Sequence, residues 1–96
     1  MGDFHQANVD PEKLRTLSVE LTVFAGKIEQ IDGDLQGGLA RLGETFRDDE
    51  YIRFRELFLR SSQQLGQFVE AIRQFTPGLD RDVEELIAAQ HIKPEI

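Results

Sequence analysis

The sequence predicts an all-α protein: an antiparallel two-helix hairpin that joins a second hairpin in a dimeric four-helix bundle. Two long segments repeat apolar residues every seven positions, the pattern of helices that pack along a seam. Between them, residues 42–49 break the phase of the repeat and allow the chain to reverse direction. The length of 96 residues, the hydrophobic content of 40% and the presence of only 3 Pro suit a single helical domain.

The first helix is expected over residues 11–44, after a flexible tail over residues 1–9. Asp10 can cap its N-terminus, and Pro11 fits the first helical position. Counting Leu14 as heptad position a, Gly38 is the one d position without a large side chain. The spacings of three, four and seven place eight large apolar side chains of this segment on one seam. The expected seam is Leu14, Leu17, Leu21, Phe24, Ile28, Ile31, Leu35 and Leu42.

The second helix is expected over residues 50–90, after a turn over residues 45–49 and before a tail over residues 91–96. Asp48 or Asp49 can cap its N-terminus. At Pro77 the helix either kinks or gives way to a separate helix over 77–90 that Thr76 would cap; the unbroken heptad phase favours the kink. With Ser61 in a d position, the expected seam is Tyr51, Phe54, Phe58, Leu65, Phe68, Ile72, Phe75, Leu79 and Leu86.

A hairpin of two helices forms a single layer without a second layer to close its core, so we expect another hairpin to supply it. Small and apolar residues off the seam lie far from the turn on the first helix and near it on the second. An antiparallel pair of hairpins would bring these two stripes together. The alternative is that they are scattered surface residues, which are common. The candidate dimer interface is Val19, Val23, Gly26, Ile52, Leu59 and Gly66.

The net charge of −7 opposes binding to nucleic acid and to anionic membranes. No apolar run is long enough for membrane insertion, and residues 1–6 lack the basic and apolar regions of a cleavable signal peptide. The chain is therefore expected to be made in the cytoplasm and, if it is exported, to leave without a cleavable leader. It contains no Cys, so disulfide and thiol chemistry are excluded.

The sequence offers no catalytic, cofactor-binding or metal-binding constellation. His5 and His91 lie in opposite tails without ligand spacing. The acidic triplet at residues 48–50 is explained by capping and by the helix dipole. Nothing in the pattern suggests a pocket. We therefore expect a protein that is not an enzyme and needs no cofactor.

Two heptad helices of about forty residues, joined by a short turn, resemble the Trp-x-Gly (WXG) hairpin family, the early-secreted-antigen-like proteins of type VII secretion. The resemblance covers about residues 10–90. The turn signature falls on Phe46-Arg47-Asp48, with Phe46 in the place of Trp and Asp48 in the place of Gly. The family's export signal is Tyr with an acidic residue four positions later, past the second helix. Here the one Tyr is Tyr51, and Arg55 follows it at that distance.

The resemblance implies a homodimeric or heterodimeric bundle that acts as a secreted effector, as a carrier or as a partner of a larger toxin. The expected partners are a second copy, a related hairpin, or a larger toxin or secretion component. The alternative is a cytoplasmic helical adaptor or chaperone that stays behind when its partner is exported. At the turn, we expect Phe46 to fold back and plug the end of the seam near Leu42 and Tyr51.

Overall fold

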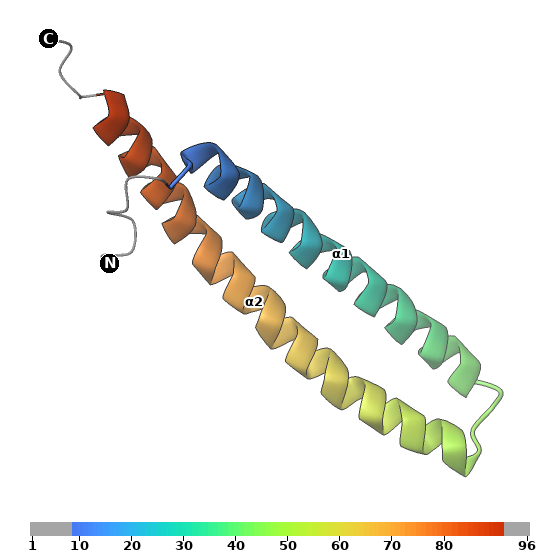
Figure 1. The fold of residues 1–96 in the computed structure, drawn as a ribbon. Coiled ribbons are helices and arrows are strands. Elements are labelled where there is room, and N and C mark those ends of the chain that lie inside the picture. Colours follow the sequence, from blue (N-terminus) through green and yellow to red (C-terminus); the bar gives the residue numbers. More distant parts are fainter. Residues whose placement is uncertain (1–8, 92–96) are drawn as a thin grey trace, which may run out of the picture.

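The computed structural model describes residues 9–91 and contains two helices in that range. Helix α1 covers Pro11–Gly43 and helix α2 covers Asp49–His91. They lie side by side and run in opposite directions, with the connecting turn at one end (Figure 1). The described residues contain no strand. The predicted all-α hairpin is thus confirmed, whereas its assembly into a four-helix bundle stays a prediction.

Aspartate side chains lie at the N-termini of both helices. The Asp10 carboxylate accepts a hydrogen bond from the Glu12 N–H at 3.0 Å, and Pro11 takes the first position of α1. The Asp48 carboxylate accepts one from the Tyr51 N–H at 2.8 Å, and Asp49 begins α2. Each carboxylate satisfies an N–H group that has no partner inside its helix.

Helix α2 continues through Pro77 as one helix, so a separate helix over residues 77–90 does not form. Proline removes one helical hydrogen bond, and packing of the neighbouring turns must offset that loss. Thr76 and Leu79, on either side of Pro77, are both buried. The tails expected over residues 1–9 and 91–96 lie almost wholly outside the described residues.

The seam between the helices is rotated from the one expected, and here the sequence-based assignment was wrong. The buried core is Ala25, Val69 and Ile72, with Leu21 and Ile28 packed against it. These are heptad positions a and e, whereas the expected seam used a and d. The large residues at the d positions, together with three at a positions, are exposed: Leu17, Phe24, Ile31, Leu35, Leu42, Phe54, Leu65, Phe68 and Phe75.

The size of the residues at position e explains the rotation. Most e positions carry a small or β-branched side chain, which lets the two backbones approach closely. The aromatic and leucine side chains at the d positions are too bulky for that gap and lie beside it instead. The buried e positions are Ser18, Ala25, Ser62, Val69, Thr76 and Val83.

The rotation gives the hairpin two different sides. On one side, the rings of Phe24 and Phe68 meet edge to face, with centroids 6.3 Å apart and planes at 80°, so the d positions of both helices share that side. On the other side, Arg73 of α2 donates two hydrogen bonds to the carboxylate of Glu29 of α1. We call the apolar side the d face; its exposed members are Leu17, Phe24, Ile31, Leu35, Leu42, Phe54, Leu57, Leu65, Phe68 and Phe75.

The ion pair on the polar side predicts a measurable pH effect. The hydrogen bonds from Arg73, and secondarily its charge, lower the pKa of Glu29 below its ordinary value, although desolvation opposes them. Because the pKa is lower in the folded state, the stabilisation is present above the ordinary pKa and is lost as the pH falls through the lowered value. Arg73→Gln is expected to raise the pKa of Glu29, measured by NMR titration of its carboxylate. Arg60→Gln is the control; an unchanged Glu29 pKa in Arg73→Gln would contradict the pairing.

Candidate functional site

The d face holds most of the exposed large hydrophobic residues among those that the structure describes. Within residues 9–91, fifteen large hydrophobic residues are exposed, ten of them on the d face, whereas five hydrophobic residues are buried in the core. A soluble monomer rarely leaves so large a contiguous apolar surface in water, and surfaces of this kind mark interaction sites.

The d face runs along the length of the hairpin rather than forming a local patch. Phe24 and Phe68 fix the antiparallel register, and one heptad toward the open end places Leu17 level with Phe75. One heptad toward the turn, the small Ser61 takes the d position on α2. The long, narrow shape suits another elongated helical surface better than a small ligand.

The structure does not bring the residues of the sequence-predicted dimer interface together. Val19 and Val23 lie at outward positions of α1, whereas Ile52 and Leu59 lie at b positions of α2, on the side that carries Arg73. Gly26 and Gly66 both face open space. Whether these residues form an interface stays a prediction.

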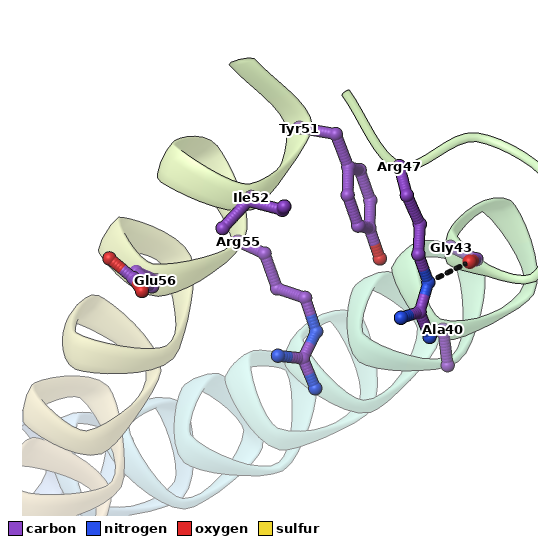
Figure 2. A pocket seen from close by; sticks show the side chains of 7 residues that line it. All are labelled: Ala40, Gly43, Arg47, Tyr51, Ile52, Arg55 and Glu56. Carbon is purple, nitrogen blue, oxygen red and sulfur yellow. Dashed lines mark hydrogen bonds between the residues drawn. The ribbon is translucent and has the colours of Figure 1, made fainter. Parts of the chain in front are cut away.

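At the turn, Tyr51 takes the place that we expected Phe46 to fill. The Tyr51 hydroxyl donates a hydrogen bond to the Leu39 carbonyl at 2.5 Å, and its ring lies against the buried Gly43 (Figure 2). The absence of a side chain at Gly43 leaves room for that ring. Phe46 is 44% exposed and Leu42 is exposed as well, so the plug predicted from Phe46 was wrong.

The close contact at Gly43 predicts that Gly43→Ala is destabilising. A Cβ there would lie 3.0 Å from the Tyr51 Cζ and closer still to its hydroxyl, so the ring would have to move. Overpacking of this kind costs about 1–3 kcal/mol. Gly26→Ala is the matched control, because its Cβ would meet nothing within 4 Å. The control should stabilise the helix by about 0.5–1 kcal/mol. Urea unfolding measures both variants, and a stabilising Gly43→Ala would contradict the tip geometry.

A pocket of about 320 Å³ lies beside this turn, on the side of α2 that carries Ile52. Arg47 and Arg55 reach toward α1 on either side of the Tyr51 side chain (Figure 2). The pocket was not predicted from the sequence, although the spacing of four between Tyr51 and Arg55, both in α2, was a partial signal for it. Its lining is Ala40, Gly43, Arg47, Tyr51, Ile52, Arg55 and Glu56.

A polar layer crosses the seam between its centre and the turn. Ser62 donates a hydrogen bond to Asp32 at 2.6 Å, and Gln36 donates to both residues, at 2.9 Å to Asp32 and 2.8 Å to Ser62. Nearer the open end, Ser18 donates to Asp80 at 2.5 Å. Polar layers of this kind fix the register of paired helices rather than adding much stability. Their role here is structural.

No group of three or more His, Asp or Glu residues within residues 9–91 is placed to hold a metal ion. In the same range, neither helix has a segment both long and apolar enough to cross a membrane. No protein-family model, curated protein or solved structure matches the chain. The resemblance to the WXG hairpins therefore depends on the heptad pattern and the turn.

Proposed function

We propose that the chain is a non-enzymatic interaction protein that pairs with a second copy of itself through the d face, forming a four-helix bundle. One observation carries the proposal: ten large apolar residues are exposed together on one side of the hairpin. Burying them against an identical face would supply the second layer that a lone hairpin lacks. A symmetric dimer uses the same face on both copies, so one apolar face is sufficient.

The size of the d face is that of a stable interface. Each of its side chains is roughly half exposed, so together they present roughly 900 Å² per chain. A standard protein–protein interface buries about 800 Å² per partner. The d face is therefore large enough to hold two copies together.

The charge pattern beside the d face also permits two copies to approach. On α2 the bordering positions carry no charge from residue 64 to residue 78, being Gln64, Ala71 and Gly78. On α1 the corresponding border alternates in sign and consists of Lys13, Glu20, Lys27, Asp34 and Arg41. If α1 of one copy packs against α2 of the other, no like charges need to face each other.

Co-expression of a tagged and an untagged copy tests the pairing. The untagged chain should be retained on the affinity resin with the tagged one. It should remain bound at high salt, because apolar burial is screened much less than charge pairing. If the untagged chain is not retained on the resin even at low salt, the proposal is overturned.

The resemblance to the WXG hairpins supports a finer proposal, that the dimer is a secreted effector, a carrier or a partner of a larger toxin or secretion component. The alternative is a cytoplasmic adaptor or chaperone for an exported partner. Detection of the chain in culture supernatant, with a cytoplasmic marker retained in the cells, favours the first. Its absence from the supernatant while its partner is exported favours the second.

A further inference from the structure

Two arginine side chains at the hairpin tip have unused hydrogen-bonding groups. The Arg47 Nε donates a hydrogen bond to the Gly43 carbonyl at 2.7 Å, which caps the end of α1 and leaves both terminal amino groups unused within residues 9–91. Arg55 makes no hydrogen bond or ion pair in that range. Capping thus accounts for one hydrogen-bonding group of Arg47 and for none of those of Arg55. The two guanidinium groups line one pocket in a chain with 18 acidic and 11 basic residues.

The pocket of about 320 Å³ continues past Arg55 into a second hollow. This second hollow of about 170 Å³ lies farther from the turn and is lined by Leu39, Phe58 and Leu59, with Gln36 at its edge. Ala40 and Arg55 line both hollows, so the two are neighbours along the groove between α1 and α2. A cationic site therefore adjoins a groove that Leu39, Phe58 and Leu59 line in part.

We propose that this tip groove binds a carboxylate that carries an aliphatic group. The carboxylate would lie at Arg55, where the two hollows meet, because a guanidinium fork matches the planar carboxylate and holds it with two hydrogen bonds. Arg47 would add its positive charge from the other side of the Tyr51 side chain. The aliphatic group would lie along Leu39, Phe58 and Leu59. The chain's net charge of −7 and the nearby Glu56 disfavour a dianion or a polyanion, so a single negative charge fits best.

The tip groove is separate from the proposed dimer interface. Ile52 and Leu59 occupy b positions of α2, on the side that carries Arg73, whereas the d face is on the opposite side. Occupation of the groove therefore requires no change in self-association. Failure of the carboxylate to bind would therefore not count against the dimer, and failure to dimerise would not count against the tip groove.

NMR titration of the full chain with hexanoate tests the proposal, with acetate and hexanamide as companions that lack the tail or the charge. Hexanoate should shift the backbone amides of Tyr51, Ile52 and Leu59 with a Kd on the order of 1 mM, typical of a ligand of that size. Acetate and hexanamide should each bind about tenfold more weakly or less. Inorganic phosphate, as a small anion without a tail, should bind no better than acetate.

Arg55→Gln is the decisive variant, because Arg55 supports no other contact among the described residues. It should weaken hexanoate binding about tenfold or more, the usual effect of losing a charge-assisted hydrogen bond. Arg53→Gln, on the same helical turn but outside both hollows, should leave binding unchanged. Hexanoate shifts that are absent, or that are equal in the two variants, would overturn the site. Equal binding of acetate and hexanoate would overturn the claim that the groove binds the aliphatic group of the ligand.

Discussion

A chain carrying Phe24→Glu is expected to remain helical but to become a monomer. Phe24 lies on the d face and meets Phe68, so a glutamate there would place a charge inside the proposed interface. In a symmetric dimer, each substitution occurs twice. Losing about 2 kcal/mol or more at each copy weakens the dissociation constant by about 1000-fold or more. Sedimentation velocity and far-UV circular dichroism measure the two parts of the prediction.

The adjacent residue offers a matched control. Val23 is 49% exposed and Phe24 is 48% exposed, but Val23 points to the outward side of α1. Val23 also belongs to the interface that the sequence suggested. If the d face is the interface, Val23→Glu stays dimeric; if the stripe containing Val23 and Leu59 is the interface, Val23→Glu dissociates and Phe24→Glu does not. The pair of variants thus decides between the two faces.

Ile72→Ala is expected to cost about 2–5 kcal/mol of folding stability, because its side chain is only 5% exposed in the core between the helices. Phe75→Ala removes a larger side chain that is 53% exposed, and it should cost only about 1 kcal/mol. Chemical unfolding measures both. The comparison belongs in the monomeric Phe24→Glu background, where dimerisation does not add to the stability of either variant.

Comparing Ile72→Ala with Phe75→Ala distinguishes the rotated seam from the a/d seam expected from the sequence. The a/d seam includes both Ile72 and Phe75, which predicts that both truncations are severe. The rotated seam buries Ile72 and leaves Phe75 beside it. A Phe75→Ala cost equal to that of Ile72→Ala would contradict the rotated seam.

The sequence was sufficient to predict the helical hairpin because its signals are local. Asp10 with Pro11, and Asp48 with Asp49, are residues that begin helices for reasons of hydrogen bonding and backbone geometry. The phase break at residues 42–49 located the turn. At Pro77, the unbroken heptad phase favoured a kink over a separate helix; α2 is one helix there, and the kink stays a prediction.

The orientation of the helices could not be read from the largest side chains alone. Large residues at a and d predicted the seam, but two facing helices bury only part of a wide apolar sector. The small residues Ser18, Ala25 and Thr76 decide which part, because they allow the closest approach. The seven-residue spacing of Ser18 and Ala25 is visible in the sequence, but its meaning depends on the partner helix. At the tip, likewise, the choice of Tyr51 over Phe46 depends on the space left by Gly43.

The tip pocket was not predicted because it depends on the contact between two distant segments. Arg47 and Arg55 meet the end of α1 only after the chain has reversed, and Ala40 contributes to both hollows. Charge pattern alone assigns exposed arginines to the solvated surface. The reversal of the chain and the packing of α2 against α1 place these two beside the groove.

The central claim is that the hairpin is one half of a four-helix bundle, and sedimentation equilibrium of the unaltered chain tests it most directly. At tens of micromolar, the measured mass should be twice the chain mass of 11.0 kDa. It should fall toward 11.0 kDa only on strong dilution or with Phe24→Glu. A mass of 11.0 kDa throughout the micromolar range would contradict the claim and would leave the d face for another partner.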